Sequence, residues 1–437
     1  MHNHPPPSLR RRAALAIPVL LAALLTACGG GGGDDDHDHE NTVIDTAGRL
    51  AVADAGSATL RLHDLDAAAA APTTFTLAAS PSALYASPGG RYAVAVQRTQ
   101  DRVQFVDGGI WQEDHGDHLH DYKQAAALAG WTLTGSRPTH YDVQPGQQAA
   151  FFMDGDAAAT PAVNAGVRLI TDASIAAGRT VAALDLPLPI HGLAEPVGDK
   201  LLTVARATDA PDTLPTHLVL YRRDGSGYVR DRELPTRCDG MHGSASSGAW
   251  SIVGCIDGML LVQHTGATTV SERKLATALR VGTLAGHPKL PGHFVGIATE
   301  GTAPAPVTTR FYAVDAAAGS VLPLQPTGWA DGSIRRAHAF DRSGTRLLLL
   351  DQQGTLSVVQ RQGNAWGTTT RVAGVIPAMP TAAPWPAIAV NGARDEVYLT
   401  DPVARQLVVF NTQTLAVTAR RNLDHVPSAV VWLGIDR

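Results

Sequence analysis

The chain lacks the features that would point to a nucleic-acid-binding protein or an integral membrane protein. Its 437 residues carry a formal net charge of −5, and no basic cluster follows Arg10, Arg11 and Arg12. Nucleic acid is therefore not expected as a partner, because nucleic-acid-binding proteins present a basic surface. No apolar run after Leu25 is long enough to cross a bilayer as a helix. The chain also has no G-x-S-x-G motif and no convincing catalytic triad.

The N-terminal segment has the layout of an export signal. Three arginines precede the apolar run Ala13–Leu25, which suits a signal peptide and is too short for a permanent membrane helix. Residues 25–28, which end in Cys28, resemble the lipobox of bacterial lipoproteins, where the cysteine is lipidated and becomes the mature N-terminus. We expect residues 1–27 to be a lipoprotein signal peptide, and a periplasmic protein anchored at Cys28. Gly29, where an aspartate would favour the inner membrane, implies the outer membrane by the same resemblance; an ordinary cleaved signal is the alternative.

Residues 28–44 are rich in glycine, aspartate and histidine and cannot build a core, so we expect a flexible tether. His37 and His39 lie in its acidic stretch and form a candidate capture tract of weak metal affinity, or else belong to a plain solvated linker.

The remaining residues, 45–437, contain a weak repeat of about 50 residues. Each repeat has short apolar strands and a turn, without a convincing amphipathic helix, which indicates an all-β fold. Four short strands per repeat describe the blade of a β-propeller. We predict a single propeller of eight blades, closed by pairing of the N- and C-terminal strands; seven blades would follow if one repeat were an insertion. The turns that define the repeat are residues 88–90, 145–146, 196–198, 246–248, 291–292, 342–344 and 391–392.

A histidine-rich loop, residues 110–122, interrupts the second predicted blade. His118 and His120 alternate, so an extended backbone points both to one side, and Gly116 allows a turn that brings His115 to them. Neutral imidazoles suit zinc, copper or nickel, and we therefore predict a metal site here rather than a plain polar loop. Four neighbouring carboxylates could act as a further ligand or orient the rings: Glu113, Asp114, Asp117 and Asp121.

A second set of histidines follows the repeat. His140, His191 and His242 are spaced by 51 residues, and His338 also precedes the turn of its repeat. Because innermost strands line the channel of a propeller, we expect some of these four to share a metal, with Asp142, Glu195 and Asp239 nearby. The alternative is that each ties loops together. His293 has the same spacing but follows its turn, so its spacing is interpreted as fortuitous.

The two cysteines beyond the signal are expected to form a disulfide, which export permits. A two-residue loop at Ser246 and Ser247 puts Cys238 opposite Cys255 across a hairpin, within bonding reach. A cysteine-containing metal site is the alternative and would need both thiols free.

Residues 109–122, followed by the stretch 135–141, resemble the periplasmic zinc metallochaperones that serve zinc-uptake ABC transporters. The resemblance implies a propeller that binds zinc and passes it to the transporter's solute-binding protein. It assigns zinc to His115, His118 and His120, with His140 and other channel histidines as further ligands. A lipid anchor departs from that family's freely diffusing carriers.

Zinc agrees with the composition of the loop, which contains no methionine and so disfavours Cu(I); Cu(II) would bind such histidines more tightly in principle. We do not expect an enzyme. The alternatives are a propeller hydrolase or lactonase with a channel metal that activates water, and a metal-free binding propeller.

Overall fold

The computed structural model describes residues 41–437 except 208–212, 267–268, 303–306 and 364. The expected signal peptide, Cys28 and the tether histidines His37 and His39 lie outside the described residues.

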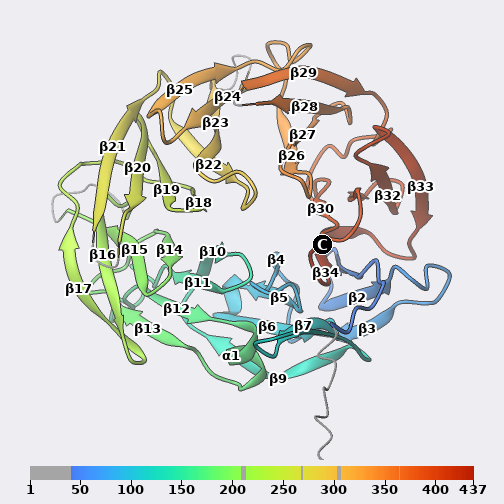
Figure 1. Ribbon diagram of the computed structural model, residues 1–437, viewed down its shortest axis with the longest axis horizontal. Coiled ribbons are helices and arrows are strands. Elements are labelled where there is room, and N and C mark those ends of the chain that lie inside the picture. The colour runs from blue at the N-terminus through green and yellow to red at the C-terminus, as the bar shows by residue number, and fades with distance from the viewer. Residues whose placement is uncertain (1–40, 208–212, 267–268, 303–306, 364) are drawn as a thin grey trace, which may run out of the picture. The chain divides into compact units, whose positions relative to one another are not determined.

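The described chain forms eight four-stranded antiparallel sheets arranged in a ring (Figure 1). This confirms the prediction of an eight-bladed propeller over the seven-bladed alternative. Each predicted turn joins the first two strands of its sheet. From the innermost strand outward, blade 1 is β34 (Pro427–Leu433), β1 (Arg49–Asp54), β2 (Thr59–Asp64) and β3 (Thr73–Thr76); blade 2 is β4 (Ala83–Ala86), β5 (Tyr92–Gln97), β6 (Arg102–Asp107) and β9 (Ala127–Thr134); blade 3 is β10 (Pro138–Gln144), β11 (Gln148–Met153), β12 (Gly166–Ile170) and β13 (Ala182–Asp185); and blade 4 is β14 (Ala194–Val197), β15 (Lys200–Ala205), β16 (His217–Asp224) and β17 (Gly227–Glu233).

The second half of the ring repeats this order. Blade 5 is β18 (Ser244–Ser247), β19 (Trp250–Cys255), β20 (Gly258–His264) and β21 (Val270–Ala276); blade 6 is β22 (Val281–Gly286), β23 (His293–Glu300), β24 (Thr308–Asp315) and β25 (Ser320–Leu324); blade 7 is β26 (Arg335–Phe340), β27 (Arg346–Asp351), β28 (Leu356–Gln362) and β29 (Ala365–Val372); and blade 8 is β30 (Ile388–Val390), β31 (Glu396–Asp401), β32 (Gln406–Asn411) and β33 (Ala416–Asn422).

Burial follows the position of a strand within its blade. The second strands are the most buried, and every residue of β5 and of β11 is buried because sheets pack on both of their faces. The outermost strands alternate between exposed and half-buried residues, as in β33. The core is therefore the set of apolar layers between neighbouring blades, which holds the innermost strands rigidly around the channel.

The ring closes as predicted. In blade 1, β34 pairs with β1, with Val52 opposite Val430 and Ala51 opposite Val431. Segments almost 400 residues apart in sequence thus share one sheet, and the innermost strand missing from the first repeat comes from the C-terminal end of the fold.

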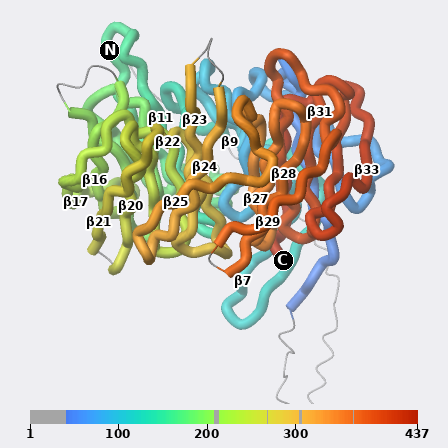
Figure 2. Tube along the Cα trace, turned by 90° about the horizontal axis from the view of Figure 1, so that it is seen from above, coloured from blue at the N-terminus to red at the C-terminus, as the bar shows by residue number. Residues whose placement is uncertain are grey.

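Three short elements depart from the blade pattern. The predicted histidine-rich loop is a β-hairpin of β7 (Ile110–Asp114) and β8 (Leu119–Lys123), inserted between β6 and β9 and projecting from one face of the ring (Figure 2). The helices are the one-turn α1 (Asp172–Ala176) and the 3₁₀ turn η1 (Arg98–Gln100). Neither helix of the described region has the length and apolarity needed to span a membrane.

Candidate metal centres

The inserted hairpin brings its three histidines together. The Cα register puts Glu113 opposite His120. His115 donates its backbone N–H to the carbonyl of His118 at 3.0 Å, and Gly116 turns the chain with a φ of +94° that favours glycine. The ring centroids lie 4.8 Å apart for His115 and His120, 4.6 Å for His118 and His120, and 5.3 Å for His115 and His118. The hairpin thus gathers its three imidazoles within ring-contact distance of one another.

Carboxylates contact this hairpin group as the sequence suggested. His115 Nε2 lies 3.8 Å from Glu113 Oε2, and His118 Nδ1 lies 2.5 Å from Asp117 Oδ1. Asp114 instead accepts the backbone N–H of Gly116 at 2.7 Å and so stabilises the turn. The tip of the hairpin is exposed, whereas His118 and His120 are half-buried. Ligands at such a tip can exchange with solvent or with another protein.

Asp121, proposed as a carboxylate ligand, belongs instead to the base of the hairpin. It is buried and accepts hydrogen bonds from the Gln112 side chain and the Ile44 backbone N–H, each at 2.8 Å, and from the Arg437 guanidinium. Burial opposes ionisation, but these three hydrogen bonds lower the pKa of Asp121. The carboxylate therefore fixes the hairpin to the segments that precede β1 and follow β34.

A second histidine group forms at the channel, where three successive blades meet. His140 lies on β10, His191 precedes β14 and His242 precedes β18, so each comes from the inner side of its own blade. Among the described residues, one ligand atom from each of the three lies within 4.8 Å of the others. The 51-residue spacing thus predicted a real convergence, and we call these residues the channel trio.

Neighbouring groups orient the rings of the channel trio. His191 Nδ1 donates to Asp154 Oδ2 at 2.9 Å, and His242 Nδ1 donates to the carbonyl of Gly282 at 2.8 Å. Both contacts use Nδ1, so Nε2 is the atom of each ring that could bind a metal; His191 Nε2 forms a hydrogen bond of 3.5 Å with His140 Nε2. Burial, followed by the two neighbouring imidazoles, lowers the pKa of His140 to about 4. His140 therefore stays neutral at ordinary pH, as a metal ligand must be.

The other repeated histidines lie elsewhere. His338 is on β26 of blade 7, where its Nδ1 accepts from Arg335 Nη1 at 2.8 Å. Burial, then the charge of Arg335, lowers the pKa of His338 to about 3. His293 begins β23, the second strand of blade 6, so its equal spacing is fortuitous as interpreted. Neither belongs to the channel trio.

The carboxylates named beside the channel histidines have structural partners. Asp142 accepts from the Ala194 backbone N–H at 3.3 Å and from Ser244 Oγ at 3.1 Å, which ties blades 3, 4 and 5 together. Burial, then Glu195, raises the pKa of Asp142, and burial raises that of Glu195. Asp239 pairs with Arg237 at 2.6 Å.

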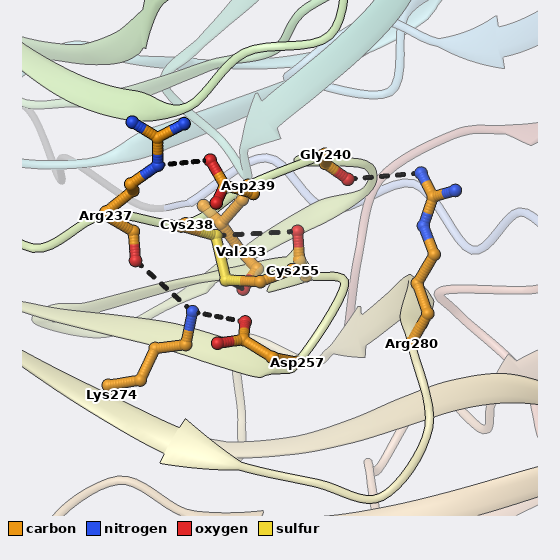
Figure 3. The surroundings of a disulfide bond; sticks show 10 residues. Arg237, Cys238, Asp239, Gly240, Val253, Cys255, Asp257, Lys274 and Arg280 are labelled. Atoms are coloured by element: carbon orange, nitrogen blue, oxygen red, sulfur yellow. Dashed lines mark hydrogen bonds and ion pairs between the residues drawn. A yellow bond between two sulfur atoms is a disulfide. The ribbon is translucent and has the colours of Figure 1, made fainter. Parts of the chain in front are cut away.

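The disulfide between Cys238 and Cys255 is present, with Cα atoms 5.2 Å apart (Figure 3). The predicted register of its hairpin is wrong, because Ser247 pairs with Trp250 and the turn lies at residues 248–249. Cys238 instead precedes β18, in the loop that carries His242. The bond joins this loop to the end of β19, so it holds His242 of the channel trio in place.

Asp154, the carboxylate that orients His191, was not predicted from the sequence. It follows β11 directly and also accepts from Thr139 Oγ1 at 2.8 Å and Arg98 Nη2 at 3.0 Å. An aspartate directly after the apolar run Ala149–Met153 of β11 was the available signal. Its contact with the channel, however, depends on the pairing of Met153 with Pro138 near the start of β10.

Comparison with known proteins agrees with this architecture. No family model matches the chain. The zinc chaperone AztD of Citrobacter koseri is 29% identical over 227 residues, which are 52% of this chain and 50% of that protein. The match thus spans about half the length of this relative.

Solved structures extend the similarity over most of the ring. A crystal structure of Citrobacter koseri AztD has a TM-score of 0.70 at 22% identity, and that of apo AztD has 0.71 at 21%; each comparison covers 89% of this chain and 98% of the other. The structure of dihydro-heme d1 dehydrogenase NirN has a TM-score of 0.57 at 11% identity. This comparison covers 89% of this chain and 76% of the NirN chain. The chain therefore has the same β-propeller fold as the solved AztD structures.

Proposed function

We propose that this chain is an exported zinc metallochaperone, which binds zinc on clustered histidines and passes it to another protein. The observation that carries the proposal is the channel trio, three imidazoles from three blades whose ligand atoms lie within 4.8 Å of one another. Imidazole nitrogens are preferred ligands of zinc, and rings oriented through Nδ1 are typical of such sites. The similarity to a protein named as a zinc chaperone supports zinc as the cargo.

The two histidine groups suit different steps of carriage. His115, His118 and His120 lie on a projecting hairpin, where Glu113 and Asp117 can complete or orient the ligand set. Ligands there can be replaced one at a time, as transfer requires. The channel trio lies on or just before the innermost strands of three packed blades, and it suits tighter retention.

The partner in this proposal is the solute-binding protein of a zinc ABC transporter, in the periplasm. The N-terminal sequence supports lipidation at Cys28, with His37 and His39 as a weak capture tract. The anchor would restrict the carrier to a membrane surface, and the outer membrane follows from the resemblance at Gly29.

Zinc titration of the purified, detergent-solubilised protein tests the proposal. We compare the wild type with a hairpin variant, in which His115, His118 and His120 are alanine, and with a channel variant, in which His140, His191 and His242 are alanine. His293→Ala is the matched control, because it removes an imidazole outside both groups. The wild type should bind about two zinc ions, each triple variant should lose one, and the control should lose none. Binding that neither variant reduces contradicts the assignment.

Transfer is tested separately from binding. The zinc-loaded protein is mixed with a solute-binding protein, and the rate is compared with that for a small chelator of equal affinity. Direct transfer predicts a rate that rises with the concentration of the solute-binding protein and exceeds free dissociation. A rate equal to dissociation for both acceptors would mean that zinc is only released.

A metal-dependent hydrolase is a second candidate, because three histidine ligands leave a fourth position open for water. A cavity of about 430 Å³ that His242 helps to line lies beside the channel trio. Turnover of lactones or phosphoesters by the zinc-loaded protein, lost in the channel variant but not in His293→Ala, would favour this candidate over the carrier.

A further inference from the structure

The cavity beside His242 has a positively charged lining. It has a volume of about 430 Å³ and lies between β22 of blade 6 and β26 of blade 7. Arg280 and Arg335 line it together with the hydroxyl-bearing Thr283, Thr299 and Thr309, and its lining contains no carboxylate. Such a lining presents donors and positive charge without an internal counter-ion.

Arg335 lacks a carboxylate partner among the described residues. Its Nη1 donates to His338 Nδ1 at 2.8 Å, whereas its Nε is buried and makes no hydrogen bond within the described part of the chain. Burial lowers the pKa of Arg335 with no acidic neighbour to offset the effect. A half-buried guanidinium without a carboxylate partner leaves its charge uncompensated, and an anion in the cavity would supply the counter-charge.

Arg280 is held at the same cavity from the other side. Its Nη2 donates to the backbone carbonyl of Gly240 at 3.1 Å (Figure 3). Gly240 lies two residues after Cys238, so the disulfide loop that carries His242 also positions this arginine. The side chain is exposed, and its remaining donors are available to a ligand.

We propose that this cavity binds a small, multiply charged oxyanion between Arg280 and Arg335, on the side of His242. Guanidinium groups bind carboxylates and phosphates through paired hydrogen bonds, and the threonine hydroxyls supply further donors. A cavity of this volume suits a ligand of small-molecule size rather than a protein segment. The ligand is either a small dicarboxylate or inorganic phosphate.

The site also has a consequence for the channel trio, which rests on the proposed zinc function. Zinc on His242 adds positive charge beside two arginines, and an anion in the cavity offsets that charge. The two ligands should therefore strengthen each other's binding by the same factor, because coupling between sites is reciprocal.

Calorimetric titration of metal-free protein with succinate and, separately, with phosphate tests the anion site without zinc. We expect one of the two probes to bind to the wild type with a dissociation constant in the millimolar range or below. Arg280→Gln should weaken binding about tenfold, and Arg335→Lys, which keeps the charge but not the paired geometry, should weaken it less than Arg335→Gln. Arg179→Gln, an exposed arginine at the end of α1, is the matched control and should bind like the wild type. No binding of either probe, or equal binding by all four variants, overturns the proposal.

Two further measurements keep the outcomes distinct. If Arg335→Gln fails to fold, as judged by its urea midpoint, the exposed Arg280→Gln still decides the test. Succinate titration of the zinc-loaded protein should show at least threefold tighter binding than the metal-free protein, and unchanged affinity contradicts the coupling. Anion binding by a protein that takes up no zinc would support the anion site and overturn the metallochaperone.

Discussion

His191 Nδ1 donates a hydrogen bond of 2.9 Å to Asp154 Oδ2, so a buried carboxylate sets the orientation of one ring of the channel trio. In metal sites such a partner fixes the tautomer of the histidine and raises its basicity, and its loss costs about 10- to 100-fold in affinity. The relationship leads to the first of four predictions.

Asp154→Asn should weaken zinc binding at the channel trio by about tenfold or more, because an amide cannot supply the same charge to His191. Zinc titration in the hairpin variant isolates the channel site. Arg98→Gln, which removes another partner of Asp154 but leaves the carboxylate facing His191, is the control and should have the smaller effect. Equal zinc affinities of the Asp154→Asn and Arg98→Gln variants would contradict the proposed role of Asp154.

Loss of the disulfide should affect the channel site and spare the hairpin site. The Cys238→Ala, Cys255→Ala double variant releases the loop that carries His242, and a cross-link of this span contributes about 3 kcal/mol to the free energy of unfolding. We expect zinc affinity to fall in the hairpin variant background and to stay unchanged in the channel variant background. Equal losses in both backgrounds would indicate a general destabilisation instead.

Asp121→Asn should loosen the hairpin at its base. The side chain of Asp121 is fully buried and pairs with the partly exposed Arg437, and the loss of such a charged hydrogen bond costs about 2 kcal/mol. Hydrogen exchange should speed up at Ile44 and along β8, and zinc affinity of the hairpin should fall. Asp45→Asn, at a fully exposed aspartate, is the control. Protected amides along β8 in the Asp121 variant would contradict this account.

Acid should destabilise the fold as the pH falls from about 6.5 to about 3. Burial lowers the pKa of His264 to about 4 and that of His338 to about 3. The unfolded chain therefore takes up these protons first as the pH falls, and stability present above pH 6.5 is lost on the way to the folded pKa. For His264 the loss is on the order of 2 kcal/mol by pH 4.5. Urea midpoints at pH 7 and pH 4.5 measure it.

Two histidine variants test whether His264 causes the loss of stability in acid. His264→Gln should reduce the difference between the two urea midpoints, because a glutamine binds no proton. His217→Gln, at a half-buried histidine of β16, should reduce it less. An identical pH dependence in all three proteins would show that other groups govern acid unfolding.

The ring and the channel trio could be predicted from the sequence because both depend on a repeat. Turns about 50 residues apart define blades, and histidines in phase with them, such as His140 and His242, must return to the same radius of the ring. The pairing of β34 with β1 could be predicted because the first repeat lacks an innermost strand, which the C-terminal strand supplies.

Details that depend on register or on long-range contacts could not be predicted in this way. The turn between β18 and β19 lies one dipeptide later than expected, yet Cys238 still reaches Cys255 because the preceding loop bends back. Asp154 and Asp121 owe their roles to partners 37 and 316 residues away. His338 also precedes the turn of its repeat, but it lies on blade 7, whereas the trio comes from blades 3, 4 and 5. There its Nδ1 accepts a hydrogen bond from Arg335.

The pairing of β34 with β1 makes assembly of the ring an event of late synthesis. Until β34 has been synthesised, β1 presents the edge of a sheet with unpaired backbone groups, which favours association with other chains. Arg437, just beyond β34, contacts Asp121 at the foot of the hairpin. The same event that closes the ring therefore also fixes the hairpin at its base, so a chain that stops short of Arg437 would lack a properly supported hairpin.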